Sequence, residues 1–135
     1  MKMARIESAV RLVLAFYKAF NRHDVPAMMQ VMSDDCLLES ASPAPDGTVY
    51  TGKEAVSRFW QDFFRASPQA HIAVEEVIGF GMRCAACWKY EWVDSAGEKQ
   101  HLRGVDLFEE KAGLLNRQRS YVKGGGGDEQ RDVSL

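Results

Sequence analysis

The strongest constraint on the fold is a change in hydrophobic period near residue 70. Before this point, apolar residues recur at steps of three and four, as on one face of a helix. After it, apolar and polar residues alternate in short runs separated by glycine-containing turns. Helices followed by antiparallel strands predict an α+β domain with the helices packed on one face of a sheet. The predicted strands lie at about 71–79, 82–93, 100–110 and 114–122.

The N-terminal segment predicts two helices. Apolar residues from Ile6 to Phe20 form one stripe, as expected of a helix that packs on a core. The polar residues 21–23 end this helix, and Asp24 is well placed to cap a second, shorter one. The apolar face of the second helix is expected to consist of the methionines Met28, Met29 and Met32.

The middle of the chain predicts a short strand, a loop and a third helix. Residues 36–39 read as a short strand, and the proline, aspartate and glycine residues of 42–47 are typical of a loop. Thr51 and Glu54 have the spacing of a capping box, which predicts that a helix begins there. That helix should end near 67–68 and bury one face, made of Val56, Phe59, Trp60, Phe63 and Phe64.

Length and composition are those of one globular domain. The chain has 135 residues, of which 46% are hydrophobic and 27% charged, and a single domain typically has about 100–150 residues. We expect this domain to span residues 1–123. The remaining residues, 124–135, begin with a glycine run and then carry charges, so we expect a flexible tail.

The charge balance and the apolar runs exclude several classes of partner. Seventeen Lys and Arg residues against nineteen Asp and Glu residues leave a formal charge of −2 without a basic stripe, so no nucleic-acid partner is expected. No apolar run reaches the roughly eighteen residues of a membrane span, and the N-terminus does not resemble a signal peptide. Three cysteines without framework spacing favour a reducing compartment, so we expect a cytoplasmic protein.

Strand parity predicts a buried carboxyl group. Side chains of a strand alternate between two faces, and the even positions of 82–92 are apolar or aromatic, which makes them the inner set. In the next strand the even set includes Asp106, so its carboxyl group should lie on the helix-covered face. A buried aspartate is either a structural group satisfied by donors or the acid of a pocket. Even positions of the last strand should lie near it: Asn116, Gln118 and Ser120.

The odd positions of these strands form the opposite face of the sheet. Val105 and Leu107 make this face apolar as well, and an apolar outer face predicts a homodimer interface. Cys84 and Cys87 have the spacing of a redox or metal motif, but in a strand their side chains point to opposite faces. The histidines lie on different elements, so neither a metal site nor a cofactor is expected.

Several segments resemble the SnoaL-like members of the NTF2-like superfamily, which includes ketosteroid isomerase and polyketide cyclases. The segments that carry the resemblance are 15–24, 32–36, 51–56, 103–108 and 119–122, together with the Gly113 turn. The resemblance implies a cone, in which a curved antiparallel sheet wraps around three helices and a deep apolar pocket. It also implies a homodimer. Because this fold hosts many functions, the resemblance specifies the fold better than the reaction.

The resemblance assigns roles to individual positions. Asp106 matches the isomerase residue that donates a hydrogen bond to the substrate oxyanion, and it also resembles the single acid/base of the cyclases. Ser40 stands where the isomerase has its carboxylate base, and Phe16 where it has a tyrosine; Tyr17, one position away, is expected to point elsewhere. Ketosteroid isomerase activity is therefore not expected. Glu39 is the nearest carboxylate to the base position, but its parity directs it away from the pocket unless a bulge intervenes.

Two functions remain open at this point. The first is an isomerase, cyclase or lyase that uses Asp106 as acid/base on a small, flat, apolar, carbonyl-bearing molecule. The second is a non-catalytic ligand-binding or dimerisation module, and an adaptor role rests on the superfamily name alone. The residues expected to line the pocket are Phe16, Tyr17, Ser40, Phe59, Trp60, Phe63, Trp88, Tyr90, Gln118 and Ser120.

Overall fold

The fold consists of three helices and six strands. The computed structural model describes residues 2–124, with side chains from residue 8 onward, so the expected tail at 124–135 lies outside the described residues except for Gly124. No helix in this range is long and apolar enough to cross a membrane. The elements are α1 (Lys2–Asn21), α2 (Val25–Gln30), β1 (Met32–Glu39), β2 (Val49–Thr51), α3 (Lys53–Ala66), β3 (His71–Phe80), β4 (Arg83–Val93), β5 (Lys99–Lys111) and β6 (Leu114–Val122).

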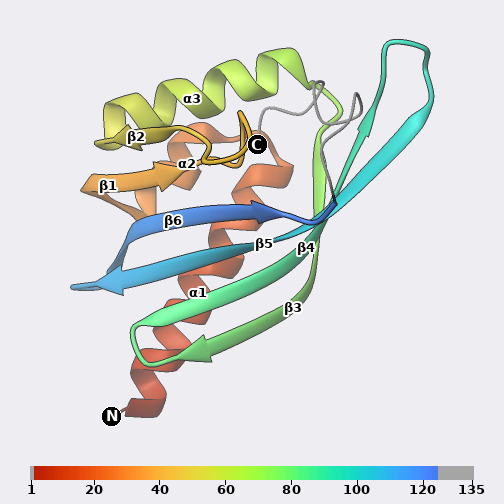
Figure 1. Cartoon of the computed structure of the whole chain (residues 1–135). Coiled ribbons are helices and arrows are strands. Elements are labelled where there is room, and N and C mark those ends of the chain that lie inside the picture. The colour runs from red at the N-terminus through yellow and green to blue at the C-terminus, as the bar shows by residue number, and fades with distance from the viewer. Residues whose placement is uncertain (1, 125–135) are drawn as a thin grey trace.

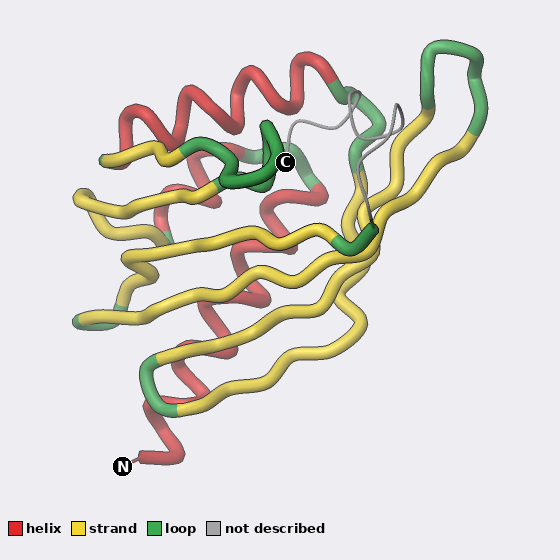
Figure 2. Tube along the Cα trace, viewed as in Figure 1, coloured by secondary structure: helices red, strands yellow, loops and turns green. Residues whose placement is uncertain are grey.

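All six strands form one curved sheet, in the order β2-β1-β6-β5-β4-β3. The expectation of a purely antiparallel sheet is wrong for one pair, because β1 and β6 run parallel. These two strands are joined through β2, α3 and the β3–β5 meander, so β6 can return beside β1 in the same direction. In Figure 1, α1 crosses behind the sheet and α3 lies above β1 and β2, and Figure 2 shows the same arrangement along the chain trace.

The core fills the space between the helices and the inner face of the sheet. The parity prediction for β4 is confirmed: Cys84, Ala86, Trp88 and Tyr90 are buried, whereas the odd positions between them are only partly covered. From the helices, Phe16 and Phe20 of α1 and Trp60 of α3 enter the same core. The inner face is thus largely aromatic, which gives this small domain much apolar area to bury.

Two element boundaries differ from those predicted. Met32 was expected on the second helix, but β1 begins there, and its side chain is buried. The proposed cap Thr51 is wrong, because this residue pairs with Leu37 as the last residue of β2. Gly52 takes the cap position of α3 with φ +92°, and no side chain caps the helix. The hydroxyl-carboxylate spacing therefore coincides with the helix start without forming a capping box.

A β-bulge changes the face of Asn116. The β5–β6 register shifts between Glu109 and Glu110, so that Arg117 and Leu115 are their partners and Asn116 is the extra residue. Leu115 turns inward and is buried, while Asn116 is only partly buried. The expectation that Asn116 shares the inner face with Gln118 and Ser120 is therefore wrong. Simple alternation fails wherever a bulge inserts one residue.

Gly104 provides a test of how tightly β5 packs. A Cβ atom at this position would lie 2.5 Å from the Cη2 atom of Trp88 and 2.5 Å from the carbonyl oxygen of Tyr121. Because a backbone oxygen cannot move without disturbing the β5–β6 pairing, we expect Gly104→Ala to destabilise the protein by roughly 1–3 kcal/mol. Urea denaturation measures this change in the free energy of unfolding. An unchanged urea midpoint would contradict this prediction, because it would mean that β5 accommodates a methyl group at position 104 without loss of stability.

Candidate functional site

Asp106 lies at the centre of a buried polar cluster. Its side chain is on β5, only 3% exposed, and Ser120 of β6 donates a hydrogen bond to Oδ1 at 2.6 Å. The Tyr17 hydroxyl of α1 and the Gln118 amide of β6 donate to Oδ2, at 2.5 Å and 3.1 Å. The expectation of a carboxyl group on the helix-covered face is confirmed. Its hydrogen-bond partners come from two different elements, α1 and β6, which hold it in one orientation.

Burial raises the pKa of Asp106 above its ordinary value. Desolvation is the largest cause, because an ionised carboxylate loses its water shell in the interior. The hydrogen bonds from Ser120, Tyr17 and Gln118 favour the charged form and oppose this effect without cancelling it. Because its pKa is raised, the neutral acid persists to a higher pH than the acid of an exposed aspartate and can donate a proton there. Its carboxylate form is also the stronger base.

Tyr17 points to Asp106, contrary to the expectation that it points elsewhere. Its hydroxyl is buried, and desolvation together with the neighbouring Asp106 charge raises its pKa well above 10. Tyr17 therefore remains a hydrogen-bond donor at neutral pH. A sequence signal for this placement does exist, because Tyr17 follows Val13 by four residues and precedes Phe20 by three on the buried stripe.

Two polar atoms beside Asp106 lack a well-formed hydrogen bond within the described residues. The Trp88 indole N–H acts on the Asp106 carboxyl group as a donor and lowers its pKa, but their geometry falls short of a full hydrogen bond. The Gln118 Oε1 atom is also unpartnered, although the amide nitrogen of the same side chain binds Asp106. Unsatisfied buried polar atoms are costly and uncommon in native proteins. One donor and one acceptor near the same carboxyl group therefore suggest a recognition site.

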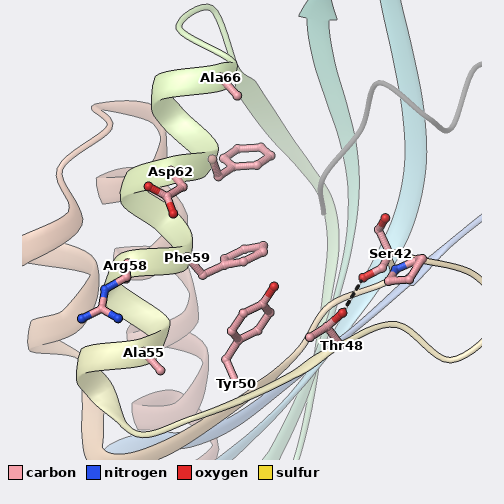
Figure 3. Close-up of a pocket in the computed structure, with 10 residues that line it drawn as sticks. Ser42, Thr48, Tyr50, Ala55, Arg58, Phe59, Asp62 and Ala66 are labelled. Atoms are coloured by element: carbon pink, nitrogen blue, oxygen red, sulfur yellow. Dashed lines mark hydrogen bonds between the residues drawn. The ribbon is translucent and has the colours of Figure 1, made fainter.

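A separate cleft of about 580 Å³ lies between α3 and the segment before and within β2. Phe59 projects into it from α3 and Tyr50 from β2, as Figure 3 shows, with ring centroids 4.8 Å apart. Arg58 and Asp62 add charges from α3. Asp106 does not line this cleft. The lining residues are Ser42, Pro43, Thr48, Tyr50, Ala55, Arg58, Phe59, Asp62, Phe63 and Ala66.

A continuous layer of aromatic rings separates the cleft from Asp106. Phe59, on the wall of the cleft, contacts Trp60 with centroids 4.9 Å apart, and Trp60 contacts Phe16 at 6.0 Å. Phe16 in turn contacts Tyr17 at 5.4 Å, edge to face, and the Tyr17 hydroxyl binds Asp106.

The Ser40 hydroxyl group has a structural role in the loop before β2. It donates to the backbone carbonyl of Ser42 at 3.0 Å and lies 3.3 Å from the carbonyl of Thr48, so it ties the loop before β2 to the end of β1. Glu39 has only partial burial and the parity opposite to that of the buried residues Leu38 and Ser40. No bulge at this end of β1 turns its carboxylate inward, since the shift in the β1–β6 register lies between Met32 and Leu37.

The residues expected to bind a ligand fall into three groups. Phe59 and Phe63 line the open cleft. Tyr17, Trp88, Gln118 and Ser120 surround Asp106. The third group lies in the aromatic core and consists of Phe16, Trp60 and Tyr90. Ser40 instead forms a hydrogen bond to the backbone of the loop before β2. The sequence reasoning missed Tyr50, Arg58 and Asp62, although the last two lie one helical turn apart beside Phe59 and Phe63.

Metal-binding side chains do not gather anywhere in the described part of the chain. No group of three or more His, Cys, Asp and Glu residues there could hold a metal ion. Cys84 lies in the core and Cys87 on the opposite face, as strand parity requires. Burial raises the pKa of the Cys84 thiol to about 11, which leaves it protonated and a poor ligand.

The raised pKa of Asp106 predicts a pH-dependent stability. An unfolded aspartate titrates near pH ~4, so the stabilisation from burying the neutral acid is complete below that pH and is lost as pH rises through the folded-state pKa. The substitution Asp106→Asn removes this titratable group and hardly changes the volume of the side chain. We expect the stability of the wild type relative to this variant to fall between pH 4 and the folded-state pKa, at up to about 1.4 kcal/mol per pH unit. Urea denaturation of both proteins from pH 3.5 to 8 measures it, and a constant difference would contradict the raised pKa.

Removing the Tyr17 hydroxyl group should lower the stability of the protein. Tyr17→Phe takes away one of the donors that stabilise the Asp106 carboxylate, so we expect a loss of about 0.5–1.5 kcal/mol in the free energy of unfolding and a further rise in the pKa of Asp106. Tyr50→Phe is the matched control, because Tyr50 lines the open cleft. Thermal and urea unfolding measure stability, and carboxyl titration by NMR follows the pKa. Equal effects of both substitutions would argue against the Tyr17–Asp106 hydrogen bond.

Comparison with known proteins places this geometry in a family. The SnoaL-like domain matches residues 13–118. The chain is also similar to an NTF2-like protein of unknown function from Mesorhizobium loti, with 28% identity and a TM-score of 0.76; the match covers 89% of this chain and 94% of that one. No curated protein matches.

Two further structures share the fold. One, from a Jannaschia species, is provisionally assigned as a SnoaL-like polyketide cyclase; it has 16% identity and a TM-score of 0.76, and the match covers 87% of this chain and 86% of that one. The other is TerC, co-crystallised with polyporic acid, with 18% identity and a TM-score of 0.76 over 86% of this chain and 92% of TerC. At these identities the likeness concerns the fold alone.

Proposed function

Because the chain belongs to the SnoaL-like domain family, we propose that it binds a small, flat, apolar molecule that carries a carbonyl and a hydroxyl group beside Asp106. One observation supports this proposal above the others. Close to the buried Asp106 carboxyl group lie a donor that this carboxyl group does not fully engage, the Trp88 N–H, and an acceptor without a partner among the described residues, the Gln118 Oε1 atom. A ligand carbonyl would satisfy the first, and a ligand hydroxyl would satisfy the second.

The surroundings of these polar atoms favour an aromatic or polycyclic ligand. Phe16, Tyr17 and Phe108 meet edge to face around the cluster, with centroids 5.4–5.9 Å apart. Flat apolar molecules pack well against such rings, while a few fixed polar groups orient them. The open cleft lined by Phe59 and Phe63 lies on the other side of the aromatic layer. We propose this cleft as the entrance.

The chemistry available to Asp106 is proton exchange at a carbonyl compound. The carboxylate form can accept a proton from the carbon next to the carbonyl, and the resulting acid can return a proton to an oxygen. Tyr17 and Ser120 hold the carboxyl group by hydrogen bonds throughout. This exchange is part of the chemistry of isomerases, cyclases and lyases of the aldol type.

The environment of Ser40 favours the non-catalytic alternative. A second acid/base group would be expected at this position for an isomerase, but the Ser40 hydroxyl is engaged with the loop carbonyl oxygens. Glu39, the nearest carboxylate in sequence, has the opposite parity. If Asp106 alone does not catalyse proton exchange, the same site serves as a ligand-binding module.

Binding is tested with polyporic acid, a flat quinone that carries both hydroxyl and carbonyl groups. Quenching of the fluorescence of the three tryptophans reports binding, and the variants below locate it. We expect Asp106→Asn to weaken binding by about tenfold, because an amide nitrogen in place of a carboxylate oxygen cannot accept from Gln118 Nε2, and the Gln118 Oε1 atom then loses its fixed orientation. Asp62→Asn is the matched control, because it makes the same chemical change in the outer cleft. A larger loss with Asp62→Asn would place the ligand in the cleft and contradict the proposal.

Catalysis is tested by deuterium exchange at the carbon next to the carbonyl of α-tetralone, followed by NMR. An exchange rate that the wild type raises and Asp106→Asn does not would support the acid/base role of Asp106. Binding of polyporic acid without exchange would support the non-catalytic module instead. Absence of both binding and exchange would reject the proposed function.

A further inference from the structure

The side-chain amide of Gln118 on β6 has one satisfied end and one unsatisfied end. The residue is 1% exposed, and its Nε2 atom donates to Oδ2 of Asp106 at 3.1 Å. Its Oε1 atom is buried without a partner among the described residues. The residues paired with Gln118 on the adjacent strands, Phe108 of β5 and Leu38 of β1, are apolar and buried. The amide oxygen is therefore available to a ligand.

The carboxylate form of Asp106 dictates which end of the amide faces it. A carboxylate only accepts hydrogen bonds, so Gln118 must turn its nitrogen atom toward Asp106. The other two donors to this group are hydroxyls, that of Tyr17 at Oδ2 and that of Ser120 at Oδ1. As long as Asp106 is ionised, Gln118 therefore presents its oxygen atom, an acceptor, on the opposite side.

Protonation of Asp106 reverses this requirement. The neutral acid carries one O–H donor, which needs an acceptor in the interior. Among the described residues, Oε1 of Gln118 is the acceptor of this cluster that lacks a partner. Half a turn about the Cγ–Cδ bond of Gln118, a torsion with a roughly two-fold preference, brings Oε1 to the Oδ2–H group. The hydrogen bonds from Tyr17 and Ser120 are retained, and Nε2 now faces the opposite side as a donor.

We infer that Gln118 is a specificity-determining residue that presents an acceptor to the ligand when Asp106 is ionised and a donor when Asp106 is neutral. The inference rests on the proposed function, because it assumes that the ligand binds beside Asp106. The ionised site then selects a compound with a hydroxyl group at this position, and the neutral site selects a ketone. A single amide thus makes the preferred ligand class depend on one proton.

The other titratable groups on the inner face of the sheet come from α1, β1, β4 and β5. Tyr17 on α1 has a pKa well above 10, and Cys84 on β4 has one of about 11. Burial also raises the pKa of Cys36 on β1. Glu110 is buried on β5, four residues from Asp106 and hence about 13 Å along the strand. The side chains that α2, α3 and β3 bury are apolar, so Asp106 is the titratable group that acts directly on the Gln118 amide.

Two ligands of similar size test the exchange of donor and acceptor. 2-Naphthol offers a hydroxyl donor, whereas α-tetralone offers only a carbonyl acceptor. Calorimetric titration of the full chain gives both dissociation constants between pH 4 and 8, where the naphthol hydroxyl stays neutral because phenols titrate near pH ~10. From pH 4 to pH 8 we expect the affinity for 2-naphthol relative to α-tetralone to rise by about tenfold, the effect of about one hydrogen bond.

The substitution Gln118→Met keeps the length of the side chain and removes both polar atoms. We expect it to reduce the change in relative affinity between pH 4 and 8 to less than about twofold, because neither a donor nor an acceptor is left to exchange. Gln61→Met is the matched control, since Gln61 is exposed on α3 and bonds only to Ser57 among the described residues. It should retain the full change.

A second measurement follows the amide in the ligand-free wild type and needs no variant. At pH 8 the Gln118 NH₂ protons should show a nuclear Overhauser effect to the Tyr17 ring, because both side chains donate to the same oxygen atom of Asp106. We expect this effect to disappear toward pH 4, as the amide reverses and turns its nitrogen away.

The outcomes separate this inference from the proposed function. If both ligands bind and their relative affinity does not change with pH, the inference is overturned while the proposed function stands. A pH-dependent change that Gln118→Met retains would also overturn it, and so would a Tyr17 effect that persists to pH 4. If neither ligand binds at any pH although the Tyr17 effect disappears, the proposed function is wrong and the reversal of the amide is supported.

Discussion

The burial of one carboxyl group links the principal parts of this structure. Asp106 loses its hydration on the inner face of the sheet, and this loss is tolerated only because donors from α1 and β6 converge on it. The convergence requires α1 to lie against the sheet with Tyr17 facing inward, and β6 to pair with β5 in the observed register. The position of the first helix, the register of the last two strands and the chemistry of the site are therefore coupled.

The two faces of the sheet carry different chemistry. The inner face is aromatic and holds the polar cluster around Asp106, with the cleft beside α3 on the far side of the ring layer. The outer face carries ion pairs between strands, such as Arg103–Glu75 and Arg117–Glu109, and partly covered apolar residues such as Val105 and Leu107. The chemistry of the candidate site is therefore confined to the helix-covered side of the sheet.

Alternation was a reliable guide where strands pair without irregularity. It correctly assigned Trp88, Tyr90 and Asp106 to the inner face, because side chains on either side of an unbroken strand must point in opposite directions. It failed at Asn116, where one extra residue in β6 reverses the order of faces. The spacing of Thr51 and Glu54 also misled, because the backbone of Thr51 was already used by the β1–β2 pair. Local patterns do not show which backbone groups a distant strand will take.

The sequence by itself determined the class of fold, the inner set of residues on β4 and the burial of Asp106, since periodicity and parity are local properties of a chain. Only the tertiary structure decided that β1 and β6 run parallel, that Tyr17 points inward and binds Asp106, and that the cleft lies beside α3. These features depend on the rotation of α1 about its axis and on the path of the chain between distant strands. Both are set by packing between segments up to 89 residues apart, as the Tyr17–Asp106 hydrogen bond illustrates.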